Sequence, residues 1–147
     1  MKVLRLFFFL VAAALFSAPC FAHHMAVIVS QDNTVQDLSS TQLGKIFRAE
    51  TKKWPGGKNI TLVLHRASTG EAVTIQHLNK VSAEQWQQWM AEHRDGVKIV
   101  ESDEEVLSYV AATPGAVGLV DVRSVNDRVR VVHVHGKLPL EAGYLPH

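Results

Sequence analysis

The chain has 147 residues, with 15 Lys and Arg against 14 Asp and Glu, and 47% of its residues are hydrophobic. This balance of charge, with no basic stripe, excludes the electrostatic signature of a nucleic-acid-binding protein. With a single Cys, the chain has neither an intrachain disulfide nor the paired cysteines of a zinc finger or a redox motif.

The N-terminus has the three parts of a secretory signal peptide. Lys2 and Arg5 form a basic region, residues 6–16 an apolar region, and "APCFA" a small-residue cleavage region. The apolar region is too short to span a bilayer as a helix. We therefore expect cleavage after Ala22, a periplasmic location and no transmembrane segment in the remaining chain. Cys20 leaves lipid attachment open, although its sequence context is a poor one for that modification.

The remaining residues, 23–147, are enough for one domain, and no internal boundary, repeat or low-complexity tract divides them. Strands are expected at 25–30, 60–64, 97–101, 116–122 and 128–134. Helices are expected at 38–50, at 70–80, at 81–96 and from Ser102 to the Pro114-Gly115 pair. This alternation of strands and helices predicts an α/β layered domain with a largely parallel sheet. The tail at about 136–147, with two prolines and two glycines, is expected to be irregular.

Local signals mark where several of these helices begin. Ser39 with Gln42 and Ser82 with Gln85 have the spacing of capping boxes. Four side chains of the 81–96 helix share one helical face: Trp86, Trp89, Met90 and His93. We interpret the aromatic stripe formed by Trp86 and Trp89 as part of the core rather than as a platform for a ligand.

The turn after the second expected strand, "HRASTGEAV", has the residue types of an anion site. A helix N-terminus offers unpaired N–H groups and the positive end of the helix dipole. Ser68 and Thr69 add hydroxyl donors, Gly70 allows close approach of the backbone, and Arg66 supplies a planar positive charge. The alternative is structural: Ser68 or Thr69 caps the helix, while Glu71 complements the dipole and repels a bound anion.

A metal site has less support in the sequence. His133 and His135 would share one face of a strand, and His23 and His24 would stand at the new N-terminus. Neither pair has a carboxylate or a third histidine nearby, as a metal site requires. No metal and no cofactor are therefore expected.

Catalysis also has little support, because the sequence contains no nucleophile elbow, zinc-protease motif or P-loop. Ser68 and His65 could form a nucleophile and base, but no third group that would orient them is evident. The acidic run "ESDEE" (101–105) is interpreted as a solvated helix start, where carboxylates are favoured. We expect a non-enzymatic protein.

Three segments occur in a recognisable order: "LSSTQLGKIFRAETKKWPGG", then "ITLVLHRASTGEA", then "TPGAVGLVDV". Their order resembles the phosphate-binding proteins of ABC transporters, which have the type II periplasmic binding-protein fold. The resemblance covers about Val27 to Val134. In that family the turn reads like R-x-D-G-S-G-T, so Arg66 is kept and Ser68, Thr69 and Gly70 stand in for its middle.

The resemblance implies a single lobe of that fold, with a mixed, mostly parallel five-stranded sheet flanked by helices. It implies a non-enzymatic periplasmic domain whose anion-binding residues are Arg66, Ser68, Thr69 and Gly70. Because the matched region corresponds to the central lobe of a two-lobe binder, binding of phosphate or a similar oxyanion is expected to be weak or completed by a partner. That partner would be an envelope protein or a second copy. The alternative is an envelope protein-interaction module that has lost ligand binding.

Overall fold

The computed structural model describes residues 24–146 of the chain. The expected signal peptide, with Cys20, lies outside the described residues. The elements, in order, are β1 (Met25–Ser30), β2 (Asp37–Leu38), α1 (Ser40–Phe47), β3 (Thr61–His65), α2 (Thr69–Asn79), α3 (Ala83–Glu92), β4 (Lys98–Val100), α4 (Asp103–Ala112), β5 (Ala116–Asp121), the 3₁₀-helix η1 (Val122–Ser124), β6 (Val129–Val131) and β7 (His133–Val134).

Five strands form a mixed sheet in the order β4-β3-β5-β1-β6. β3 pairs in parallel with β4 and with β5, whereas β1 pairs antiparallel with β5 and with β6. Every strand of this sheet except β1 therefore runs in the same direction. The expected α/β domain with a mixed, mostly parallel five-stranded sheet is confirmed.

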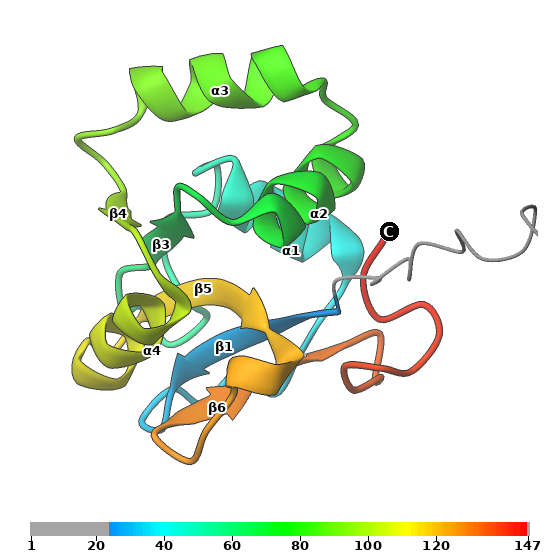
Figure 1. Cartoon of the computed structure of the whole chain (residues 1–147). Coiled ribbons are helices and arrows are strands. Elements are labelled where there is room, and N and C mark those ends of the chain that lie inside the picture. The colour runs from blue at the N-terminus through cyan, green and yellow to red at the C-terminus, as the bar shows by residue number, and fades with distance from the viewer. Residues whose placement is uncertain (1–23, 147) are drawn as a thin grey trace, which may run out of the picture.

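The sheet is covered by helices on both faces (Figure 1). Alternation of side chains along β1 sends Met25, Val27 and Val29 into one buried cluster, which α1, α2 and α3 cover. Ala26 and Ile28 point to the other cluster, which α4 covers. Strands that are covered on both faces read as continuous apolar runs, as the "MAVIVS" segment does.

The expected strand over 128–134 is wrong as a single element. β6 pairs with β1 in the main sheet, but β7 pairs in parallel with β2 in a separate two-stranded sheet. β2 itself lies where no strand was expected, and its Leu38 was placed at the start of the helix expected at 38–50. A continuous valine pattern cannot show that the chain changes its pairing partner between Val131 and His133, because both pairings are non-local.

This break also separates the two histidines of "HVH". His133 directs Nδ1 to the Gln36 carbonyl, whereas His135 has a φ of 52° and its Nε2 contacts the Ser40 hydroxyl at 2.6 Å. The two side chains therefore do not share a strand face. No cluster of three or more potential metal ligands occurs within residues 24–146.

The helix starts agree closely with the sequence signals. Both expected capping boxes form, at Ser39 with Gln42 and at Ser82 with Gln85. Within the aromatic stripe, Trp86 is 3% exposed and stacks on Trp89, which in turn stacks on His93. Because the stripe packs into the core, its interpretation as a packing feature is confirmed.

The "WPGG" and "TPGA" segments meet at one buried contact. The Trp54 indole N–H donates to the Gly115 carbonyl at 2.9 Å, and the same carbonyl accepts from the Thr61 N–H at 3.1 Å. Gly115 has a φ of 92°, and a side chain there would place Cβ 2.3 Å from the Asn59 carbonyl oxygen. Only glycine fits this close approach, and the contact fixes where β3 and β5 begin.

The tail after β7 has no helix or strand up to Pro146, but it is anchored. The Tyr144 hydroxyl donates to the Val132 carbonyl at 2.6 Å and accepts from the Val27 N–H at 3.1 Å. Its burial raises the pKa of Tyr144 to about 12. The last described residues are therefore held against β1, with Leu145 also buried in the core.

None of the helices between residues 24 and 146 combines the length and the apolar character that crossing a bilayer requires.

Candidate functional site

The chain leaves the carboxyl ends of β3 and β4 toward opposite faces of the sheet, and the region between these two connections is called the crevice below. These neighbouring parallel strands end at the same edge, but β3 leads into α2 on one face and β4 leads into α4 on the other. In open α/β sheets, ligands bind where neighbouring connections leave toward opposite faces. The candidate site is therefore built from the residues around the N-termini of α2 and α4.

The turn before α2 has the geometry of a helix cap. Ser68 is the N-cap, and its hydroxyl accepts from the Glu71 N–H at 3.1 Å. The Ser68 N–H donates back to the His65 carbonyl, and the first helical bond runs from Ala72 to Ser68. Within the described chain, the N–H groups of Thr69 and Gly70 have no acceptor. These two groups are the donors that a ligand could use.

Arg66 extends from the same turn into solvent and pairs with an acid. Its guanidinium lies 3.4 Å from the Glu101 carboxylate, and both side chains are more than half exposed. Its backbone N–H donates to the Val100 carbonyl, which ties the turn to β4. An anion at this turn would have to compete with Glu101 for Arg66, although an exposed ion pair of this kind is weak.

Glu71 lies beneath the turn with 1% of its surface exposed. Both of its carboxyl oxygens accept from the His65 N–H, at 3.0 and 3.1 Å. Burial raises the pKa of Glu71 well above its ordinary value, the bond from the His65 N–H opposes this rise, and the nearby Asp103 carboxylate adds to it. Glu71 therefore neither complements the dipole from the surface nor points into the crevice; it fills the space under the turn.

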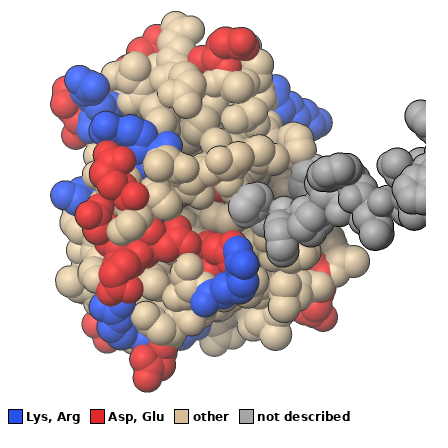
Figure 2. All heavy atoms as spheres, viewed as in Figure 1, with Lys and Arg blue, Asp and Glu red and all other residues tan. Residues whose placement is uncertain are grey.

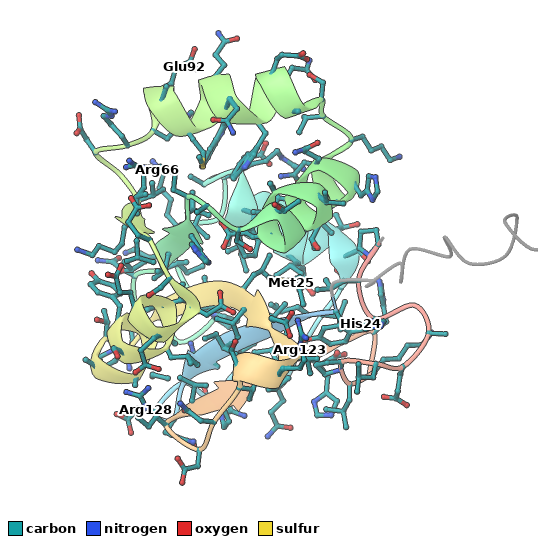
Figure 3. All side chains as sticks on the ribbon, viewed as in Figure 1. His24, Met25, Arg66, Glu92, Arg123 and Arg128 are labelled. Atoms are coloured by element: carbon teal, nitrogen blue, oxygen red, sulfur yellow. The ribbon has the colours of Figure 1, made fainter. Side chains whose placement is uncertain are left out.

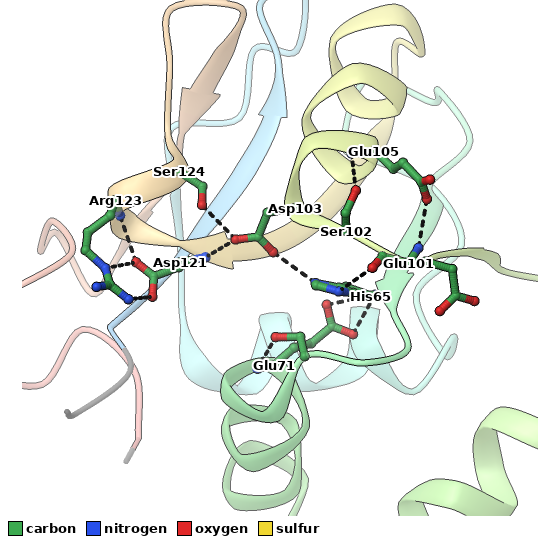
Figure 4. Close-up of polar contacts among 10 residues, drawn as sticks. His65, Glu71, Glu101, Ser102, Asp103, Glu105, Asp121, Arg123 and Ser124 are labelled. Atoms are coloured by element: carbon green, nitrogen blue, oxygen red, sulfur yellow. Dashed lines mark hydrogen bonds and ion pairs between the residues drawn. The ribbon is translucent and has the colours of Figure 1, made fainter. Parts of the chain in front are cut away.

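His65, at the end of β3, joins the two sides of the crevice. Its Nδ1 lies 2.9 Å from the Asp103 carboxylate, and its Nε2 lies 3.0 Å from the Glu101 carbonyl (Figure 4). The second Asp103 oxygen accepts from the Asp121 N–H and from the Ser124 hydroxyl. We call these five residues (His65, Glu71, Asp103, Asp121 and Ser124) the carboxylate network.

Acidic side chains dominate the surroundings of the turn. Figure 2 shows Asp and Glu side chains gathered beside β4 and the N-terminus of α4. At that N-terminus Ser102 caps the helix, and Glu105 reaches back to the Glu101 N–H at 2.8 Å rather than to Ser102 itself. The positive end of α4 thus already has three carboxylates of the protein in its first turn.

The structure brings together all four expected anion-site residues in one turn, but it gives them different surroundings. Arg66 and Thr69 are exposed, Ser68 is half-buried, and Gly70 is buried. Ser68 does not contact His65 through its hydroxyl, since that oxygen caps α2 and both ring nitrogens of His65 face other acceptors. The geometry contains no nucleophile–base pair at this turn.

Asp103 is the residue that the sequence reasoning missed. It was interpreted as one of several solvated acids, yet it receives three hydrogen bonds from other elements and its side chain is only 22% exposed. Its position directly after a helix cap was visible in "ESDEE". Its partners in β3, β5 and η1 were not, because they depend on the sheet order.

Comparisons with known proteins agree with this fold. The chain is 32% identical over 120 residues to the phosphate-binding protein PstS of Bacillus subtilis (strain 168), covering 78% of this chain and 37% of that protein. Its structure resembles an ABC-type phosphate transport receptor from Vibrio cholerae, with a TM-score of 0.64 and 22% identity, over 79% of this chain and 48% of that one. PstS from Borrelia burgdorferi also has a TM-score of 0.64, at 18% identity, over 79% of this chain and 49% of that one.

The chain thus spans half or less of the length of these relatives. The Bacillus subtilis relative is named a phosphate-binding protein and the Vibrio cholerae structure a phosphate transport receptor, and these names agree with the expectation of a non-enzymatic domain. Residues 15–142 match the PBP superfamily domain, and the chain therefore belongs to the PBP superfamily, as a relative of the phosphate-binding proteins.

Proposed function

We propose that this chain is an exported periplasmic domain that binds phosphate or a similar oxyanion at Arg66, Ser68, Thr69 and Gly70. Residues 1–22 act as its cleaved signal peptide, and residues 23–147 form the domain. The binding is weak, or a partner completes it. The names of the relatives, a phosphate-binding protein and a phosphate transport receptor, support this choice of ligand.

The observation that carries the proposal is the pair of N–H groups without acceptors, on Thr69 and Gly70, beside an exposed guanidinium. A helix N-terminus contributes about 1 kcal/mol to anion binding, and each charge-assisted hydrogen bond about 1.5–3 kcal/mol. A few such contacts, less the cost of displacing Glu101, correspond to dissociation constants from millimolar to tens of micromolar. A partner that covers the crevice would supply further contacts to the anion.

The test is a phosphate titration of the protein without its first 22 residues, followed by calorimetry and by thermal unfolding. We expect saturable binding that is lost in Arg66→Ala. Arg128→Ala is the matched control, because Arg128 pairs with Glu104 on the surface and lies far from Arg66 (Figure 3). If tens of millimolar phosphate shift neither the heat signal nor the melting temperature, this chain alone does not bind phosphate.

A second candidate function is an interaction module of the cell envelope that has lost ligand binding. The carboxylate network favours it, because Glu71 and Asp103 engage the N–H groups of His65 and Asp121 in contacts within the protein. The uncovered crevice would then dock a second copy or another envelope protein. Sedimentation with and without phosphate separates the two candidates: a monomer that binds phosphate excludes the second, whereas a dimer indifferent to phosphate supports it.

A further inference from the structure

A second polar region lies near the opposite end of β3, away from the turn. There a pocket of about 480 Å³ opens between the C-terminal end of α3, the end of α1 and the segment that leads into β3. This volume is within the range of small-molecule sites. α3 is the outermost element on this side of the molecule (Figure 1).

The floor of the pocket is apolar. Ile46 and Leu62 belong to the core and are 3% and 4% exposed, and Ile60 packs against them from the segment before β3. A short hydrocarbon chain that lay on these side chains would lose contact with water. Burial of that kind is worth about 0.8 kcal/mol for each CH₂ group.

Apart from Ala49 and Gly96, the remaining lining is polar, and it contains no acid. Thr51, Lys52, Asn59 and His93 line the pocket, and no Asp or Glu is among its described lining residues. Within residues 24–146, the side chains of Thr51, Lys52 and Asn59 make no hydrogen bond or ion pair. The Lys52 backbone is fixed nonetheless, since its carbonyl accepts from the Ile60 N–H at 2.9 Å.

His93 is held in a fixed orientation. Its ring stacks on Trp89 with centroids 4.2 Å apart, and its Nδ1 donates to the Trp89 carbonyl at 2.8 Å. That bond leaves Nε2 as the ring nitrogen available to a ligand. The same carbonyl also accepts the His93 N–H. This carbonyl at the negative end of α3 is therefore already hydrogen-bonded within the protein.

We propose that this pocket binds a small monocarboxylate that carries a short apolar chain. Lys52 pairs with the carboxylate, the hydroxyl and amide groups of Thr51 and Asn59 complete its shell, and the chain lies on Ile46, Ile60 and Leu62. This site is separate from the turn that Arg66 and Ser68 form. It goes beyond oxyanion binding because it requires an apolar group on the ligand.

The test is a titration with hexanoate, hexylamine and hexanol, followed by amide chemical shifts. Hexanoate should bind saturably and move the resonances of Ile60, Leu62 and Gly96, whereas the resonances of 66–70 stay in place. Lys52→Gln should weaken hexanoate binding about tenfold, the value of one charge-assisted hydrogen bond. Lys53→Gln is the matched control, since this exposed neighbour does not line the pocket.

Three results would overturn the proposal. The first is no saturable response to hexanoate. The second is an equal response to hexylamine or hexanol, which would show that charge plays no part. The third is equal hexanoate affinity in Lys52→Gln and the wild-type protein. Because inorganic phosphate has no apolar chain, a failure here leaves phosphate binding at Arg66 untouched, and the converse also holds.

Discussion

The two ends of β3 carry polar regions that differ in how their positive groups are balanced. At the end near α2, Arg66 pairs with Glu101, the His65 ring lies against Asp103, and the His65 N–H donates to Glu71. At the end near α3, Lys52 and His93 line a pocket without an acid. Groups that are already paired inside the protein contribute to stability, whereas unpaired groups remain available to a ligand.

This difference predicts that substitutions in the carboxylate network change stability, whereas substitutions around the pocket change binding. It also shows that the motif order of a family does not by itself leave every charged group free to bind a ligand. The turn has the residue types of an anion site, but its Arg66 already pairs with Glu101. The following predictions test that division.

The largest effect is expected from Asp103→Ala. The substitution removes the acceptor of His65 Nδ1, the Asp121 N–H and the Ser124 hydroxyl at once, in a partly buried setting. We expect a loss of about 2–4 kcal/mol in the free energy of unfolding, measured by chemical denaturation. Glu104→Ala, in the same helical turn, removes only exposed contacts with Arg128 and the Ser108 hydroxyl and should cost less than about 1 kcal/mol. Similar costs for the two variants would contradict the role of Asp103.

Glu71→Gln should change how stability depends on pH. Because the folded-state pKa of Glu71 is raised above 4.5, the carboxyl stabilises the fold fully only below pH 4.5, and this contribution is lost as pH rises through the folded-state pKa. Glu71→Gln has no carboxyl at this position, so its free energy of unfolding does not fall with pH for this reason. The free energy of unfolding of Glu71→Gln, minus that of the wild-type protein, should therefore increase with pH above 4.5. If this difference in the free energy of unfolding stays constant or falls above pH 4.5, the folded structure does not favour the protonated form of Glu71.

These two residues also show what the sequence could predict. Local features could be predicted: both capping boxes, a cap at Ser68 or Thr69, the aromatic stripe and most strand positions follow from the spacing of residues close together in the chain. Motif order also pointed to the fold. Asp103 and Glu71 could not be placed, because their partners come from other strands and because burial of a carboxylate depends on packing above and below it. The switch from β6 to β7 was missed for the same reason, since it depends on where β2 lies.

A smaller effect is expected from removal of a helix cap. Ser68→Ala and Ser82→Ala each delete a side chain that accepts an N–H at a helix start, at 3.1 and 3.2 Å. Each should lower the free energy of unfolding by about 1 kcal/mol. Only Ser68→Ala should also weaken phosphate binding, since Ser82 lies at the start of α3, outside the turn. If both variants weaken phosphate binding equally, the effect reflects lost stability and not a contact with the anion.

The smallest effect is expected from Glu101→Gln. This variant distinguishes the two regions most directly, because it should change binding at only one of them. This change removes the carboxylate that pairs with Arg66 but keeps the Glu101 carbonyl that His65 contacts. An exposed pair of this kind is worth up to about 1 kcal/mol, so phosphate affinity should rise about two- to fivefold, as measured by calorimetry. Hexanoate affinity should stay the same, because its pocket lies near the other end of β3. If phosphate binds no better once Glu101 is neutral, then the pair with Glu101 does not limit the ability of Arg66 to bind phosphate.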